Sequence, residues 1–182
     1  LDGGNPSFYL DAAFTQLSDA DTLSEAISSV ANNGIIYIGT TYTIANTEYL
    51  STSDTIKIQR LAGFTGAMIE VSSTGELVIG KNSLGETMAG KIIVDGGAIW
   101  QTSRGANTTP NNSQYAENAG IAAQESMIVV QDGAKLYMYK DVALQNNELK
   151  YDGKAGAAIY SLGDIVAEGV TIERNLACHG AV

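Results

Sequence analysis

The strongest constraint on the fold is a stretch near the end of the sequence that nearly repeats itself. Asp141–Asn147 reads DVALQNN and Gly169–Asn175 reads GVTIERN, so an apolar–small–apolar triplet recurs with an Asn three residues after it, at an offset of 28. Self-similarity at a fixed period of roughly 20 to 50 residues is the signature of a solenoid. Short β-rich runs separated by Gly and Asp turns, without an apolar period of helix length, predict a β-solenoid.

The repeat extends toward the N-terminus at a larger offset. Residues 127–138 resemble residues 68–79 at a shift of 59, which exceeds one 28-residue coil by about 31. Insertions in repeat proteins go to loops, so we assign this excess to two side loops, near 80–90 and 101–119. Two plain coils would give the same shift, but no strand triplet is visible between residues 100 and 120.

The sequence predicts short strands from residue 35 onward, each bounded by turn residues. A pair of strands joined by one brief turn is also what a hairpin would give, but three strands in every 28 residues favour a coil with three faces. The predicted strands are Ile35–Ile38, Tyr42–Ile44, Thr55–Ile58, Met68–Val71, Leu77–Ile79, Lys91–Val94, Met127–Val130, Leu136–Met138, Val142–Leu144, Ala157–Tyr160, Ile165–Ala167 and Val170–Ile172.

One helix is predicted before these strands. Thr22 and Glu25 have the spacing of a capping box, in which each side chain satisfies the other's backbone N–H. Leu23, Ile27 and Val30 form an apolar stripe at helical spacing. Because a solenoid has an open end that needs covering, we interpret this helix as an N-terminal cap. The predicted division is residues 1–34 for the N-terminal segment and capping helix, and 35–182 for the solenoid.

Composition narrows the list of partners. The formal net charge is −10 and the sequence pI is about 4.4. Such a balance repels phosphate backbones and anionic membrane surfaces, so nucleic acid is not an expected partner. No run of 18 apolar residues exists, so no direct membrane insertion is expected.

Five phrases early in the chain occur in an order that resembles a known family: Thr55–Ile58, Gly63–Gly66, Met68–Ser73, Leu77–Ile79 and Ile92–Gly97. They are similar to the N-terminal portion of bacterial cell-surface proteins with right-handed parallel β-helix repeats, the pectin-lyase-like fold. The later coils of these proteins carry a Gly-Gly-Ala-Ile/Val phrase and a strand ending in Asn, which Gly96–Ile99, Asn147 and Asn175 fit.

This resemblance covers residues 21–182 and carries several expectations. It implies an all-β protein, a right-handed parallel β-helix with three faces, behind an N-terminal amphipathic capping helix. It also implies an exported protein of extracellular or cell-surface location, often an adhesin. Separately, Gly180–Val182 resembles the opening of another coil, so we expect the solenoid to be truncated at its C-terminal end.

The same fold hosts polysaccharide lyases and glycoside hydrolases, so catalysis is tested at the level of residues. Strand stacking places equivalent side chains about 4.8 Å apart, so a catalytic acid cluster requires acids at equivalent positions. The repeat aligns Glu70 with Val129 and Glu76 with Lys135, which gives no acid pair. His179 precedes Gly180 as in polygalacturonases, but the accompanying Asn-Thr-Asp and Asp-Asp motifs are missing. We therefore predict no catalytic residue, no metal site and no cofactor, apart from adventitious Ca²⁺ at Asp-Gly turns.

Recognition by surface side chains is the remaining source of function. The polar run 101–119 is long enough to be a functional loop. We predict a ligand-binding surface for a host or matrix glycan or protein, in which aromatic side chains form a platform. The candidate ligand-binding residues are Trp100, Arg104, Tyr115, Tyr137 and Tyr139.

Asn147 and Asn175 have a structural interpretation. An Asn at the same corner of consecutive coils can adopt a left-handed backbone and donate its amide to the next Asn, which makes a ladder.

Three functions remain open at the level of sequence. The first is a non-catalytic surface or adhesin-type module that presents loops to a ligand. The second is a polysaccharide lyase or glycoside hydrolase with an unrecognised site. The third is a self-assembling structural unit of a surface filament or layer, which associates end to end through an exposed C-terminal coil.

Overall fold

The computed structural model describes residues 8–10, 18–98, 122–149 and 156–177, and in these residues the fold is all-β with one short helix. The helix is α1, Leu23–Ser29, and sixteen strands are distributed over four sheets. Sheet A has the order β1 (Phe8–Tyr9), β2 (Ile35–Ile38), β5 (Thr55–Arg60), β8 (Lys91–Asp95), β12 (Val142–Gln145) and β16 (Thr171–Glu173).

Two four-stranded sheets and one small sheet complete the set. Sheet B has the order β3 (Tyr42–Ile44), β6 (Ile69–Val71), β10 (Ile128–Val130) and β14 (Ile159–Ser161). Sheet C has the order β4 (Thr47–Leu50), β7 (Glu76–Ile79), β11 (Lys135–Met138) and β15 (Asp164–Ala167). The fourth sheet pairs β9 (Ala122–Ala123) with β13 (Glu148–Leu149).

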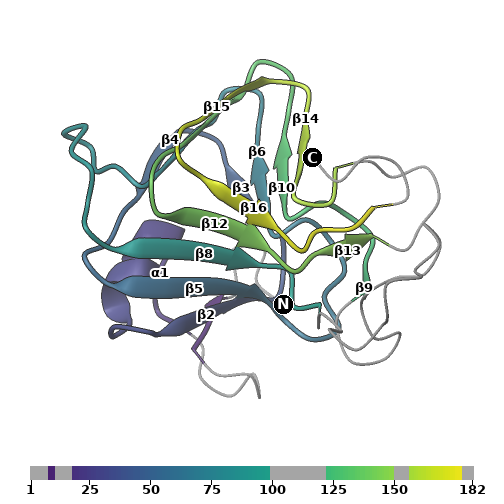
Figure 1. Cartoon of the computed structure of the whole chain (residues 1–182), viewed down its shortest axis with the longest axis horizontal. Coiled ribbons are helices and arrows are strands. Elements are labelled where there is room, and N and C mark those ends of the chain that lie inside the picture. The colour runs from purple at the N-terminus through teal and green to yellow at the C-terminus, as the bar shows by residue number, and fades with distance from the viewer. Residues whose placement is uncertain (1–7, 11–17, 99–121, 150–155, 178–182) are drawn as a thin grey trace.

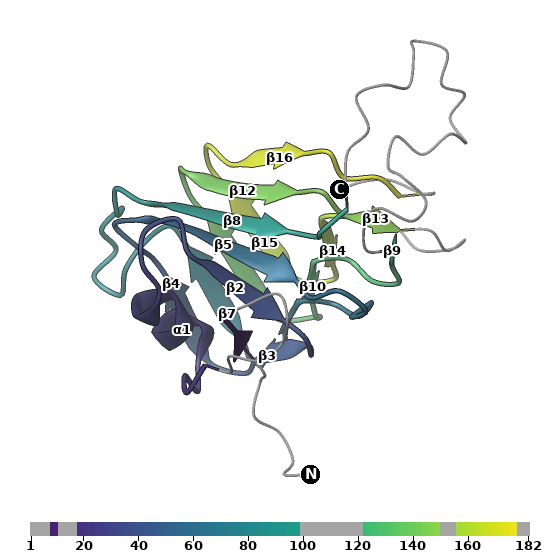
Figure 2. The ribbon, with the colours of Figure 1, turned by 90° about the horizontal axis from the view of Figure 1, so that it is seen from below.

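The chain visits the three large sheets in turn. From β2 onward it places one strand in sheet A, one in B and one in C, and then returns to A. Figure 2 shows β2, β5, β8, β12 and β16 stacked in that order. Among the described strands every pairing is parallel, with the exception of β1, which runs antiparallel to β2.

The repeat offsets predicted from sequence are the strand registers of the structure. Leu144 pairs with Ile172 at the offset of 28, and Val130 pairs with Val71 at the offset of 59. Since β6 and β10 are direct neighbours, the larger offset is a single pass of the chain with extra residues, and two plain coils are ruled out. Residues 81–87 form one of the predicted loops, closed by an antiparallel bridge between Lys81 and Thr87. The second, 101–119, lies outside the described residues.

The twelve predicted strands correspond to strands of the structure, with ends that differ by no more than two residues. Four further strands were not predicted: β1, β4, β9 and β13.

The core lies between the three sheets and is built from columns of apolar side chains. Along β5 the side chains alternate between half-buried and buried, as expected for a strand with one inward face. The parallel register places inward residues of successive strands above one another, and each buried aliphatic side chain contributes roughly 1.5–3 kcal/mol. One such column in each sheet is Ile36, Ile58, Val94 and Leu144 in A, Ile69 and Ile128 in B, and Leu50, Ile79 and Met138 in C.

Helix α1 lies beside β4 at the N-terminal end of the stack (Figures 1 and 2). Its capping box is present, because the Thr22 side chain accepts from the Glu25 N–H and Glu25 accepts from the Thr22 N–H. Leu23 and Ile27 are buried in the main core cluster, and Val30 packs against it in a half-buried position. The helix ends at Ser29, earlier than predicted, because Val30 is already extended.

Glu48 joins the helix to the sheets. Glu48 lies on β4 and pairs with Leu77 on β7, which in turn pairs with Leu136 on β11. A carboxylate therefore occupies the first position of a column that is otherwise apolar. Its Oε1 accepts from the Ser24 N–H at 3.0 Å, and its Oε2 accepts from the Tyr42 hydroxyl at 2.6 Å. Burial and the bond to Glu48 raise the pKa of the Tyr42 hydroxyl above its ordinary value, so this hydroxyl remains a donor. The carboxylate thus satisfies an orphan N–H of the first helical turn.

A buried arginine occupies the corner between sheets A and B. Arg60, at the end of β5, is 0% exposed, and its guanidinium donates to backbone oxygens of Gly66 and Glu125 and, at 3.3 Å, to Asn147 Oδ1. Its carbon Cζ lies 5.6 Å from the centre of the Phe64 ring. Burial lowers the pKa of Arg60 to about 10, which the Glu125 charge opposes, so it remains charged at neutral pH.

Asn147 and Asn175 lie at this same corner in two successive passes of the chain. They do not form the predicted ladder of side-chain amides. The Asn147 backbone N–H donates to Asn175 Oδ1 at 3.0 Å, and the Asn175 amide donates to the Leu144 carbonyl. The left-handed residues are Asn146 and Arg174, one position before each Asn, so the prediction of a left-handed backbone was one residue late. The turn is made by the preceding residue, which leaves each Asn side chain free to bond inward.

Replacing Glu48 tests the link between helix and sheets. E48Q keeps the side-chain shape but replaces one acceptor oxygen by an NH₂ group, which cannot accept from Ser24 or Tyr42. We expect a loss of about 1–2 kcal/mol in the free energy of unfolding, measured by urea denaturation. E173Q, on the exposed edge of β16, is the matched control and should change stability by less than about 0.5 kcal/mol. Equal stability of both variants would contradict the role given to Glu48.

Replacing Arg60 tests the polar corner. R60M keeps most of the volume and removes every donor, so the Gly66 and Glu125 carbonyl oxygens and Asn147 Oδ1 each lose a donor. The expected loss is about 2–4 kcal/mol in the free energy of unfolding, from guanidinium chloride denaturation. Q59M, one residue earlier and facing outward, is the control, with a change below about 0.5 kcal/mol. An R60M variant as stable as the parent would show that these bonds contribute nothing net.

Candidate functional site

The predicted ligand-binding residues divide into two groups. Trp100, Arg104 and Tyr115 lie outside the described residues. Tyr137 lies on β11 and Tyr139 directly follows it, and both are half-buried on the outer face of sheet C. The described residues that flank the segment 99–121 are elsewhere: Ala98 bonds to Asn146 at the corner between sheets A and B.

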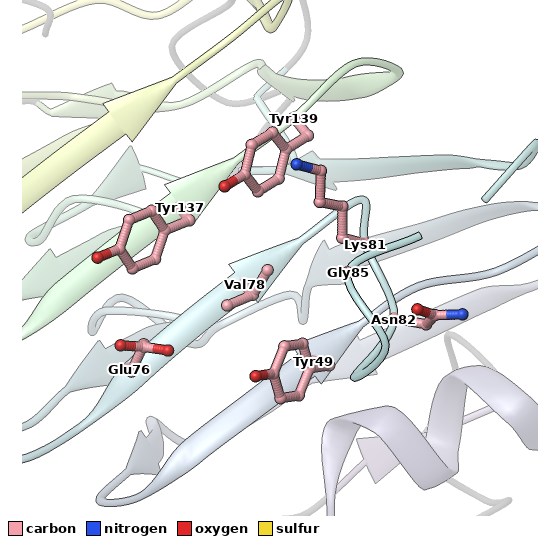
Figure 3. Close-up of a pocket in the computed structure, with 8 residues that line it drawn as sticks. All are labelled: Tyr49, Glu76, Val78, Lys81, Asn82, Gly85, Tyr137 and Tyr139. Carbon is pink, nitrogen blue, oxygen red and sulfur yellow. The ribbon is translucent and has the colours of Figure 1, made fainter. Parts of the chain in front are cut away.

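Tyr137 and Tyr139 line a shallow groove with a volume of about 270 Å³ (Figure 3). The floor comes from three strands of sheet C and one wall from the loop 81–87. The other lining residues are Tyr49, Glu76, Val78, Lys81, Asn82 and Gly85.

Strand pairing sets the geometry of the floor. Tyr49 on β4 pairs with Val78 on β7, and Val78 pairs with Tyr137 on β11. The three side chains therefore lie in one row across the sheet, with about 4.8 Å between neighbouring strands (Figure 3). Val78 is 7% exposed, so the two phenol rings are the accessible parts of this row.

A cation–π contact between Lys81 and Tyr139 joins the loop 81–87 to the floor of the groove. Gly80 has a φ of 94°, a left-handed conformation that turns the chain out of β7 into the loop. The Lys81 ammonium then lies 3.6 Å from the centre of the Tyr139 ring. Figure 3 shows the two side chains next to each other. A cation over an aromatic face at this distance is attracted by the ring quadrupole, which fixes the orientation of Tyr139.

The side chain of Asn82 organises the loop. Its Oδ1 accepts from the Leu84 N–H at 3.0 Å and from the Glu86 N–H at 2.9 Å, and its Nδ2 donates to the Glu86 carboxylate. Such a turn mimics a backbone turn and holds a short loop in one shape. It leaves Leu84 at the tip with 80% of its surface exposed.

The groove carries polar groups that are free to bond a ligand. Among the described residues, no hydrogen bond or ion pair involves the hydroxyls of Tyr49, Tyr137 and Tyr139 or the Glu76 carboxylate. Aromatic rings combined with a few convergent polar groups are typical of ligand sites. Ring faces contact the C–H groups of a sugar, while phenol and carboxylate oxygens bond its hydroxyls.

The acid positions follow the predicted alignment. Glu76 pairs with Thr47 on one side and Lys135 on the other, and Glu70 pairs with Val129. In the described part of the chain no group of three or more His, Cys, Asp or Glu side chains is placed to hold a metal ion. His179, which was considered from the sequence and not assigned as catalytic, lies outside the described residues.

A second hollow lies among the last described strands of each sheet and has a volume of about 360 Å³. Its lining is mainly apolar and includes inward positions such as Met138, Ile159, Ile165 and Ile172. It is a continuation of the core and carries few groups that would orient a polar ligand.

Replacing Asn82 tests whether the loop is held by one side chain. N82A removes the two bonds to the Leu84 and Glu86 N–H groups, so these amides should exchange with deuterium at least tenfold faster. The measurement is hydrogen exchange followed by mass spectrometry of peptides covering residues 80–90. S83A, on the adjacent exposed residue, is the control. Unchanged exchange in N82A would mean that backbone bonds alone hold the loop.

In the described residues, no helix is long and apolar enough to span a membrane. Comparison with known proteins found no matching family model, no matching curated protein and no matching solved structure.

Proposed function

We propose that the chain is a right-handed parallel β-helix that acts as a non-catalytic module, in an extracellular or cell-surface location, and contacts a glycan through the tyrosine groove on sheet C. The cyclic order of the three sheets and the parallel pairing support this fold. Parallel strands are almost always joined by right-handed connections, which supports the hand.

The observation that carries the function is the row of Tyr49, Val78 and Tyr137 beside Tyr139 and Lys81. If these aromatic side chains served packing alone, they would not need phenol hydroxyls. Their hydroxyls have no hydrogen-bond partner among the described residues, which favours a role in binding. Rings supported from below by β-strands are rigid, so they bind a flat apolar sugar face at little cost in side-chain entropy.

A non-catalytic role is favoured over hydrolysis by the neighbours of the groove carboxylate. Inverting and retaining glycosidases both use a pair of carboxyl groups, at separations of about 5 to 9.5 Å. The strand partners of Glu76 are Thr47 and Lys135, which supply no second acid. Lys135 separates Glu76 from the next acid of this row, Asp164, which lies two strand spacings, or about 9.6 Å, away.

The proposal is tested by removing the rings. Y137A and Y49A should each weaken binding of a glycan ligand at least tenfold, which corresponds to about 1.4 kcal/mol. A glycan array identifies the ligand, and calorimetry measures its affinity for each variant. Y160A is the matched control, because Tyr160 is 43% exposed on the outer face of β14, in sheet B. Binding that survives both substitutions, or an array without any bound glycan, would refute the proposed function.

A further inference from the structure

The spacing of the tyrosine row points to the class of glycan. We infer that the groove binds an unbranched, neutral, extended β-1,4-linked hexose chain that lies across the strands of sheet C, with Tyr49 and Tyr137 under alternate sugars. This inference rests on the proposed function and adds to it the linkage, charge and direction of the ligand.

The first argument is the distance along the stack. Tyr49 and Tyr137 are separated by one intervening strand, β7, which places them two strand spacings, or about 9.6 Å, apart. In a fully extended β-1,4-linked hexose chain each sugar advances by about one strand spacing. The two rings therefore match sugars n and n+2, and sugar n+1 would lie over Val78. Figure 3 shows Val78 between Tyr49 and Tyr137.

The second argument is the symmetry of the ligand. Successive sugars of such a chain are rotated by about half a turn, so sugars n and n+2 present the same face in the same direction. Two tyrosines on one face of one sheet, related by strand stacking, present their rings in the same direction. An α-1,4-linked chain curves and cannot keep both sugars flat on a straight row.

An extended peptide fits this row less well. Side chains on one face of a peptide strand repeat every two residues, at about 6.6–6.8 Å, which does not match a spacing of about 9.6 Å. The floor also offers little strand edge to a peptide, because β7 and β11 are paired on both sides and β4, the end strand of sheet C, has helix α1 beside it.

The charges favour a neutral polymer. The net charge of −10 opposes a polyanionic glycan, and the Glu76 carboxylate lies in the groove itself. Lys81 is the cation of the groove among the described residues, and its ammonium lies over the Tyr139 ring. Hydroxyl and N-acetyl groups can bond to the phenols and to Glu76 without adding charge.

The test is the dependence of affinity on chain length. Calorimetry of the 182-residue chain with cello- and chito-oligosaccharides of two to six sugars should show at least a tenfold increase in affinity between dimer and tetramer. At least three sugars are needed to reach both rings. Maltohexaose and hexagalacturonate, the curved and the charged controls, should bind at least tenfold more weakly than the best β-1,4-linked hexamer.

Substitutions of Tyr49 distinguish the loss of a binding contact from a general loss of folding. Y49A should remove the increase of affinity with chain length, while Y49W should retain this increase. Thermal melting checks that each variant is folded. Equal affinity for dimer and hexamer, or maltohexaose binding as tightly as the β-1,4-linked hexamers, would overturn the inference. If an array ligand of another class binds through Tyr137 and no β-1,4-linked chain does, this inference is wrong and the proposed function stands. If no glycan binds at all, both are wrong.

Discussion

Parallel, in-register pairing between successive passes of the chain is the constraint on which the rest of the structure depends. From β5 onward, each strand of sheets A, B and C bonds to the strand one pass earlier, so its inward positions lie directly above inward positions of that strand. An apolar residue is therefore required at the same point in each pass, and this requirement produces the columns of the core. The outer face obeys the same register, so side chains from distant parts of the sequence also form rows.

Two charged side chains, Glu48 and Arg60, occupy positions in the inward columns, where the register calls for apolar residues. Glu48 and Arg60 lie where apolar side chains would continue the stack, and each has directed partners: a helix N–H and a phenol for Glu48, backbone oxygens and Asn147 for Arg60. Each marks a place where the simple repeat stops, at the end covered by α1 and at the corner between sheets A and B. These bonds offset much of the cost of removing each charge from water, while the Arg60 Nε–H is buried without a hydrogen-bond partner among the described residues.

The groove on sheet C is formed by outward-facing residues of the paired strands and by the loop 81–87, which interrupts one pass of the chain. Stacking brings Tyr49, Val78 and Tyr137 into a row, and the loop that leaves β7 at Gly80 brings Lys81 over Tyr139. The loop is held by Asn82, so the groove has a fixed wall next to a flat floor. A repeating scaffold thus acquires a distinct surface where extra residues interrupt one pass.

The sequence by itself determined the features that depend on local spacing: the register offsets of 28 and 59, twelve strands, the capping box at Thr22 and the loop at 80–90. Tyr137 and Tyr139 were identified as candidates, but Tyr49 was missed, because β4 follows β3 by a turn two residues shorter than the one between β6 and β7. Only the tertiary structure decided that Tyr49 and Lys81 lie beside them, and that the left-handed residues precede Asn147 and Asn175. The physical reason is that spacing along the chain fixes which residues face inward, whereas neighbours across the sheet are fixed by turn lengths and strand pairing.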